Sequence, residues 1–91
     1  MIDPEIRRFA LASLREMNFD VAGLDDDSVL GPAGADLDSV ALAELGIRVE
    51  DRFGVTFADD EAEALAAMTI GEFCQAVAAL REAAAPAGGR S

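Results

Sequence analysis

Apolar residues recur every three or four positions in three stretches of this 91-residue chain. This spacing places them along one side of an α-helix, so each stretch predicts a helix with one buried face. We expect these helices over about residues 4–17, 39–53 and 70–83. The first has Asp3 as its N-cap and Pro4 at its first helical position, and the last begins with a capping box in which Thr69 precedes Glu72 by three positions. Helices with apolar faces in so short a chain bury them against one another.

The segments between these helices complete the predicted fold. Residues 18–38 are rich in Asp, Gly and Pro but carry apolar residues that predict a packed loop rather than a free linker. A short acidic helix is expected over about residues 59–66. The predicted fold class is therefore all-α, a four-helix bundle of three long helices and one short helix with a long first loop. We expect one domain over residues 1–83 and a disordered C-terminal tail over residues 84–91.

Charge limits the partners that this chain can bind. The net charge is −11, from 18 acids against 7 basic residues, all of them arginine. Such a surface repels nucleic acids and anionic membranes and favours protein partners that present basic patches. Charged residues interrupt every apolar stretch, and the N-terminal residues lack the apolar core of a signal peptide. We therefore expect a cytoplasmic protein, working as a monomer, that binds neither nucleic acid nor membrane.

Residue types also argue against catalysis and metal binding. The chain has no histidine and no lysine, so neither a Ser-His-Asp triad nor an activated cysteine can be assembled from it, and Cys74 is predicted to be structural. Asp25, Asp27 and Asp36 have the spacing of a calcium loop, but apolar residues stand where that loop needs an oxygen ligand and a glycine. We predict neither an enzyme nor a metal site.

The stretch GADLDSVALAEL, residues 34–45, places a serine at the start of the second predicted helix. Ser39 could cap this helix, since a serine hydroxyl accepts a hydrogen bond from a first-turn amide. Alternatively Asp38 is the cap, which leaves the Ser39 hydroxyl free at the surface. A helix N-terminus favours a phosphate group through its unpaired amides and its dipole, so Ser39 is a candidate for modification by a phosphodiester.

The outward side of the same helix carries a second pattern. Val40, Glu44, Ile47 and Asp51 are spaced by four, three and four residues and alternate aliphatic with acidic side chains. This alternation is typical of a docking surface for a partner with a basic and partly apolar patch. The other interpretation is an ordinary exposed helix on which Glu44 pairs with Arg48. Spacing alone leaves both open.

Residues 36–65, DLDSVALAELGIRVEDRFGVTFADDEAEAL, resemble the acyl carrier protein family. The shared features are the Asp-Ser-aliphatic motif, a glutamate five residues after the serine, the FGV sequence and an acidic third helix. The resemblance implies that a separate phosphopantetheinyl transferase attaches a 4′-phosphopantetheine arm to Ser39, and that the thiol of the arm holds intermediates as thioesters. It also implies that the following residues contact partner enzymes: Asp38, Val40, Glu44, Ile47, Glu50 and Asp51.

Three positions depart from the family pattern, and they bear on the pathway. Val40 replaces the commonest leucine, Ala58 stands where a proline often opens the third helix, and Arg52 stands where many fatty-acid carriers are acidic. Arg52 therefore argues against a standard fatty-acid synthase carrier. The exclusive use of arginine over lysine and the high alanine content are typical of a high-GC genome, which favours natural-product biosynthesis.

The expected function is that of a free-standing acyl carrier protein in a polyketide or related pathway. Its expected partners are the transferase, acyltransferase or ligase loading enzymes, and ketosynthase-type or condensation enzymes. The alternatives are an aminoacyl or peptidyl carrier of nonribosomal peptide biosynthesis, a fatty-acid synthase carrier, and, in a different class, an acidic helical adaptor without a cofactor.

Overall fold

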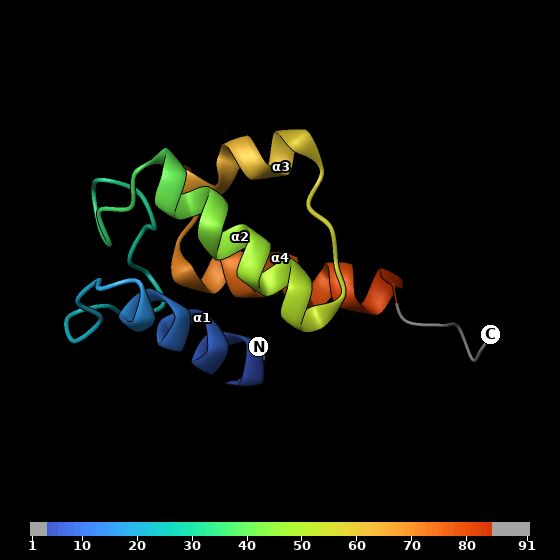
Figure 1. Ribbon diagram of the computed structural model, residues 1–91, viewed down its shortest axis with the longest axis horizontal. Coiled ribbons are helices and arrows are strands. Elements are labelled where there is room, and N and C mark those ends of the chain that lie inside the picture. The colour runs from blue at the N-terminus through green and yellow to red at the C-terminus, as the bar shows by residue number, and fades with distance from the viewer. Residues whose placement is uncertain (1–3, 85–91) are drawn as a thin grey trace.

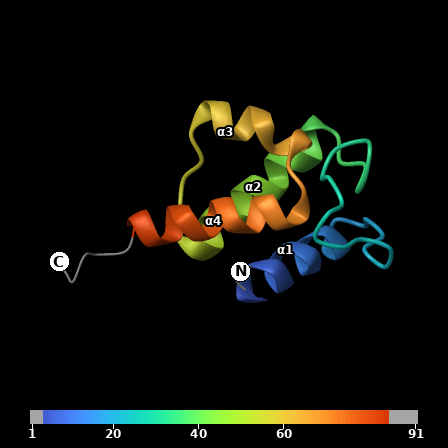
Figure 2. The same cartoon turned by 180° about the vertical axis from the view of Figure 1, so that it is seen from behind.

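The chain folds into a helical bundle. A computed structural model describes residues 4–84, without the side chains of Ala62 and Ala84. Its helices are α1 (Pro4–Glu16), α2 (Ser39–Phe53), α3 (Asp59–Ala64) and α4 (Ile70–Ala84), and a 3-10 turn (Leu65–Ala67) follows α3. Helices α1, α2 and α4 pack together, and the short α3 lies across α2 on the side away from α1 (Figures 1 and 2). The predicted all-α bundle is confirmed.

The helix boundaries agree closely with those expected from the sequence. Helix α2 has the predicted bounds, whereas α1 ends one residue before its predicted end. The predicted third helix is α-helical only as far as Ala64 and finishes as the 3-10 turn. The predicted tail begins at residue 84, but in the structure residue 84 is the last residue of α4. Residues 85–91 and the predicted cap Asp3 lie outside the described residues.

The core is built from one face of each long helix. Ile6 and Leu14 of α1, Leu45 and Val49 of α2, and Phe73 of α4 are all fully buried. Burial of an aliphatic or aromatic side chain of this size stabilises the fold by about 1.5–3 kcal/mol. Cys74 is also fully buried within this core, which agrees with its predicted structural role.

The long connection between α1 and α2 is packed, as the sequence predicted. Leu30 and Leu37 are only 1% exposed, so this segment contributes to the core. Its backbone also pairs with the segment before α4: the Leu30 amide donates to the Met68 carbonyl at 2.9 Å, and the Ile70 amide donates to the Ser28 carbonyl at 2.8 Å. These bonds satisfy buried backbone groups that a free loop would leave to water.

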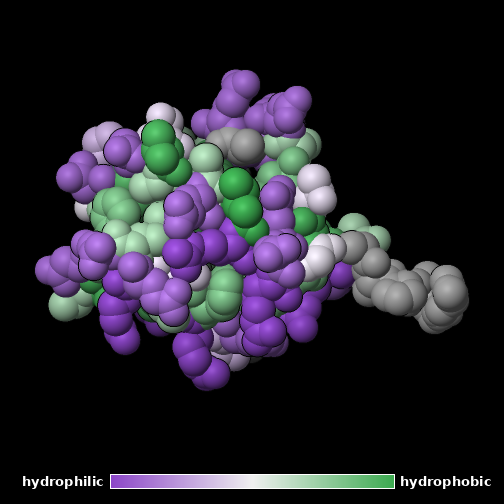
Figure 3. Space-filling view, viewed as in Figure 1, coloured by the Kyte–Doolittle hydropathy of each residue, from purple (hydrophilic) through white to green (hydrophobic). Residues whose placement is uncertain are grey.

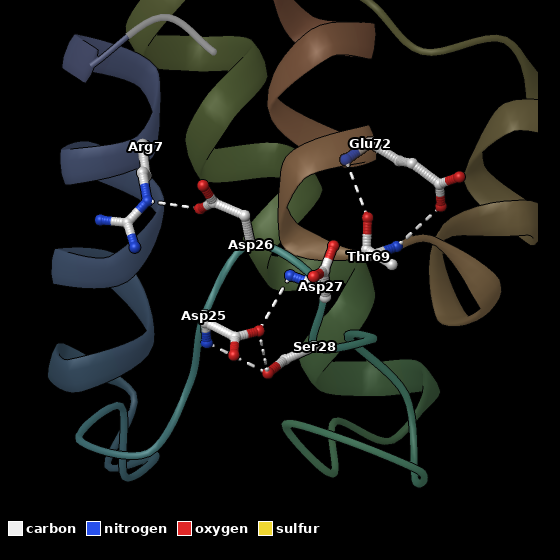
Figure 4. Close-up of polar contacts among 7 residues, drawn as sticks. All are labelled: Arg7, Asp25, Asp26, Asp27, Ser28, Thr69 and Glu72. Carbon is white, nitrogen blue, oxygen red and sulfur yellow. Dashed lines mark hydrogen bonds and ion pairs between the residues drawn. The ribbon is translucent and has the colours of Figure 1, made fainter. Parts of the chain in front are cut away.

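Side-chain contacts fix the same region (Figure 4). The Arg7 guanidinium donates to Asp26 at 2.6 Å, and this hydrogen bond raises the pKa of Arg7 above its ordinary value. Asp25 accepts a hydrogen bond from the Asp27 amide at 2.9 Å. Two of the acids that have the spacing of a calcium loop therefore shape a turn instead. At the start of α4, the Thr69–Glu72 capping box forms both of its hydrogen bonds, at 2.9 and 3.0 Å.

Gly46 lies on the buried side of α2, but the packing around it does not require a glycine. A buried glycine in a helix indicates the close approach of another helix, and Gly46 is indeed buried. A Cβ atom at this position would lie 3.7 Å from Leu65 and 4.0 Å from Phe57, which are ordinary van der Waals distances. Close packing therefore does not require the glycine, and its effect is to leave room beside these two side chains.

Gly34 and Gly31 are glycines at which the neighbouring backbone leaves no space for a Cβ atom, and the space is smaller at Gly34. The chain reverses here, with the Ala35 amide donating to the Val29 carbonyl at 2.8 Å, and a Cβ on residue 34 would collide with that same carbonyl oxygen. Nothing lies within 4 Å of a Cβ placed on Gly23 in the same connection.

We predict that Gly34→Ala lowers the free energy of unfolding by about 2 kcal/mol or more, because the backbone must shift to admit the methyl group. The matched control Gly23→Ala should change it by less than about 1 kcal/mol. Urea unfolding followed by circular dichroism measures both variants. If the two variants have the same urea midpoint of unfolding, the turn accommodates the methyl group on residue 34 without loss of stability and the prediction is wrong.

Candidate functional site

The N-terminus of α2 is capped by Asp38. This residue has extended backbone angles, φ −83° and ψ 179°, and its carboxylate accepts a hydrogen bond from the Ala41 amide at 2.8 Å. Of the two capping arrangements that the sequence left open, the structure therefore has the aspartate as the cap. Ser39, the first residue of α2, is exposed, and within residues 4–84 its hydroxyl has no hydrogen-bond partner.

A largely apolar cleft of about 570 Å³ opens beside Ser39. It lies between α2 and the segment that contains α3 and the 3-10 turn, and Gly46 contributes to its wall. The residues that line it are Pro32, Leu37, Asp38, Ser39, Leu42, Ala43, Gly46, Ile47, Glu50, Phe57, Glu63, Leu65 and Ala66. All its charged groups are carboxylates, so the cleft combines apolar walls with an acidic border.

A second, shallower hollow lies on the outward side of α2. It is lined by Ser39, Val40, Ala43, Glu44, Ile47 and Arg48. Val40 and Ile47 are 75% and 63% exposed, which makes them the large apolar side chains most open to solvent in the described chain. Figure 3 shows hydrophobic groups over α2 that are surrounded by hydrophilic side chains. Ser39 lines both hollows and so stands where they meet.

Arg48 ties the outward side of α2 to α1. It donates to Glu44 at 3.0 Å and to Glu16 at 2.9 Å, and these two hydrogen bonds raise the pKa of Arg48 above its ordinary value. The surface pair that the sequence offered as the plain interpretation of Glu44 is therefore present. It coexists with the exposed apolar residues, because Arg48 lies toward α1 while Val40 and Ile47 point outward.

Two of the predicted partner-binding residues, Glu50 and Asp51, do not line the outward hollow. Glu50 is half-buried, lines the cleft, and accepts a hydrogen bond from the Phe57 amide at 2.7 Å. It therefore holds the connection between α2 and α3. Asp51 is exposed and lines neither hollow. Ser39, Val40, Glu44 and Ile47 therefore line one hollow, whereas Glu50 has a structural contact.

Sequence reasoning missed the cleft altogether. Its far wall comes from Phe57, Leu65 and Ala66, which lie beyond α2 in an acidic stretch of irregular spacing. The one available signal was Gly46, a glycine on the buried side of a helix. That glycine indicated missing side-chain volume, but only the fold shows that the space is open to solvent beside Ser39.

The acidic residues do not assemble into a metal centre within residues 4–84, where no group of three or more His, Cys, Asp or Glu side chains is placed to hold an ion. Over the same residues, no helix has both the length and the apolar composition required to cross a bilayer.

Comparison with known families identifies the class of protein. The model of the phosphopantetheine attachment site family matches residues 13–77, which is most of the chain and includes the cleft, α2 and Ser39. The chain belongs to this family. No curated protein and no solved structure matched it.

Family membership settles the broad function. Such a domain is the site of covalent 4′-phosphopantetheine attachment and serves as a non-catalytic tether that interacts with modifying and loading enzymes. This protein is therefore a phosphopantetheine-bearing carrier protein. It is neither an enzyme nor the cofactor-free adaptor that its acidic composition also allowed.

The cap assignment generates a stability prediction. Asp38→Ala removes the side chain that accepts from the Ala41 amide, so it should lower the free energy of unfolding by about 1 kcal/mol. Ser39→Ala, one residue later, removes an exposed hydroxyl outside the cap and should change it by less than about 0.5 kcal/mol. Urea unfolding of the two variants and the parent measures the difference. A larger loss for Ser39→Ala than for Asp38→Ala would reverse the assignment of the cap.

Proposed function

We propose that Ser39 is the residue that carries the 4′-phosphopantetheine arm. The observation that carries this proposal is the division of roles at the start of α2, where Asp38 caps the helix and the Ser39 hydroxyl remains exposed between the two hollows. The other serines within the matched family region are poorly suited. Ser13 is only 2% exposed, and the Ser28 hydroxyl is hydrogen-bonded to Asp25 at 3.3 Å.

Electrostatics at this helix end also favour the attachment. Ser39 begins a helix of 15 residues, and the first turn of that helix contains no acidic residue. The positive end of the helix dipole and the first-turn amides stabilise a negatively charged phosphodiester there, by about 0.3–1 kcal/mol at an exposed position. The repulsion from Asp38 is offset in part because its carboxylate is directed at the Ala41 amide.

The chain itself supplies position rather than chemistry. It has no histidine, and its only thiol, on Cys74, is fully buried. The nucleophile that holds the cargo is therefore the thiol of the arm, which Ser39 presents at the surface. We propose that residues 1–83 form this carrier domain and that it works as a cytoplasmic monomer.

The proposed pathway is polyketide or related natural-product biosynthesis, in which the carrier shuttles thioester-bound intermediates between enzymes. Support comes from Arg52, which stands where fatty-acid carriers are often acidic. In the structure this arginine lies 3.6 Å from Glu5 and over the Phe9 and Phe53 rings, so it belongs to the packing between α1 and α2. An aminoacyl or peptidyl carrier and a fatty-acid carrier are the alternatives within the family. Loading assays with malonyl, acyl and aminoacyl donors distinguish them.

We further propose that enzymes dock on the outward side of α2, around Val40, Glu44, Ile47 and Asp51, beside Asp38 and Ser39. Support comes from the two exposed aliphatic side chains, which are flanked by carboxylates. Acidic residues at such a rim attract a basic enzyme surface, and the apolar residues at its centre lengthen the lifetime of the complex.

The attachment site is tested by intact-mass measurement after co-expression with a broad-specificity phosphopantetheinyl transferase. The parent should gain the mass of one phosphopantetheinyl group, and Ser39→Ala should gain none. Ser28→Ala, the matched control, should be modified like the parent because its hydroxyl serves only the turn at Asp25. Modification of a folded Ser39→Ala variant would refute the assignment.

The docking surface is tested by transferase kinetics at two salt concentrations. Reversing Glu44 and Asp51 to arginine should slow association at low salt by at least about 10-fold, and the defect should shrink in 1 M salt, where the screening length falls to about 3 Å. Ile47→Ala should raise the KM with little dependence on salt.

The matched control reverses two exposed acids elsewhere, Asp27→Arg with Glu82→Arg, and so gives the same net charge. This control should retain most of the parental rate. If both double variants slow equally, net charge rather than the α2 surface governs the encounter.

A further inference from the structure

The outward side of α1 carries two arginines whose charge the fold does not use. Arg8 and Arg15 are exposed and lie opposite the buried side of α1. Together with Pro4, Arg7, Leu11 and Ala12 they line a shallow hollow of about 310 Å³. We call Arg8, Leu11, Ala12 and Arg15 the arginine face. Figure 3 shows hydrophilic side chains projecting along the lower edge of the molecule, where α1 lies in Figure 1.

These two arginines differ from the other arginines that the structure describes. The others each lie within 4 Å of a carboxylate: Arg7, Arg48, Arg52 and Arg81. In the described part of the chain, neither Arg8 nor Arg15 forms an ion pair or a side-chain hydrogen bond. The chain has 18 acidic residues and a net charge of −11, and yet no ion pair in the described residues involves Arg8 or Arg15.

The spacing of the pair matches a second helix. Arg8 and Arg15 are seven residues apart, which is two helical turns, or about 10.5 Å along the axis at about 1.5 Å per residue. Carboxylates seven residues apart on another helix have the same separation. Between the arginines, half-buried Leu11 and exposed Ala12 offer a small apolar floor without a bulky side chain.

We propose that the arginine face of α1 docks an acidic amphipathic helix of a partner protein. Two carboxylates of that helix pair with Arg8 and Arg15, and a small apolar side chain between them rests over Leu11 and Ala12. Guanidinium groups suit this role because they form paired, charge-assisted hydrogen bonds with carboxylates. The attraction is local: at physiological salt the screening length is about 8 Å, so acidic residues far from this face weaken the attraction little.

Charge favours an acidic helix at the arginine face over a second copy of the chain, a nucleic acid or a membrane. A second copy of the chain brings another net charge of −11 and is repelled over a wide surface. A nucleic acid or an anionic bilayer needs several cations or inserted aromatic side chains, whereas this face has two unpaired arginines and no aromatic residue.

The arginine face lies on a different helix from Ser39 and the outward side of α2. A partner held at α1 therefore leaves the start of α2 accessible, so that the carrier can stay bound to one protein while other enzymes act on the arm. This inference does not depend on Ser39 being the attachment site.

The experiment measures binding of the full chain to a synthetic helical peptide of about 20 residues that carries pairs of glutamates seven residues apart with alanine and leucine between them. Arg8→Gln with Arg15→Gln should weaken binding by at least about 10-fold, and higher salt should weaken binding of the parent. The matched control, Gln75→Glu with Ala79→Glu, adds two negative charges on the exposed side of α4 and so reaches the same net charge. It should bind the peptide within about 2-fold of the parent.

Three results would overturn the proposal. These are parental binding that survives replacement of both arginines, equal weakening by the α4 control, and tighter arginine-dependent binding to phosphatidylglycerol vesicles than to the peptide. The rate of phosphopantetheinyl transfer separates this inference from the proposed function, because it should be unchanged in the double glutamine variant. A slowed transfer would assign the arginine face to the transferase interface instead.

Discussion

The pairing of two irregular segments holds the functional end of this molecule together. Residues 28–31 of the first connection exchange backbone hydrogen bonds with residues 66–70, through the pairs Leu30–Met68, Gly31–Ala66 and Ile70–Ser28. This pairing fixes where α2 begins relative to the 3-10 turn. Without it, the carboxylate of Asp38 and the hydroxyl that follows would still lie at a helix end, but no cleft wall would stand beside them.

Helix α2 serves three purposes with three of its sides. One side enters the core through Leu45 and Val49, and a second, with Gly46, borders the cleft. The third faces solvent with Val40 and Ile47. A helix of this length can do so because its positions return to each side every three or four residues. Residues that follow one another in sequence therefore take part in different functions.

The distribution of arginine shows how an acidic chain uses few cations. Arg48 and Arg52 both connect α1 and α2. Arg48 pairs with Glu16 and Glu44, and Arg52 pairs with Glu5 and lies over the Phe9 and Phe53 rings. These pairs are largely exposed, so solvent screens them and each contributes little to stability. Arg8 and Arg15 form no such pairs in the described structure, so their guanidinium groups are available to the partner helix that we propose.

The amino-acid sequence by itself determined the helices, the Asp38–Ser39 pair at the start of α2, and the alternation of aliphatic and acidic residues along its outward side. Each of these is local, because capping and helical periodicity act within a few residues. The sequence left open whether Asp38 or Ser39 is the cap, and it grouped Glu50 with the outward residues. Only the tertiary structure decided that Asp38 accepts the Ala41 amide, that Glu50 turns to the Phe57 amide, and that a cleft opens beside Ser39. The cleft depends on contacts between α2 and residues of the segments that follow it, Phe57, Leu65 and Ala66, and the spacing within α2 does not encode which of those side chains meet it.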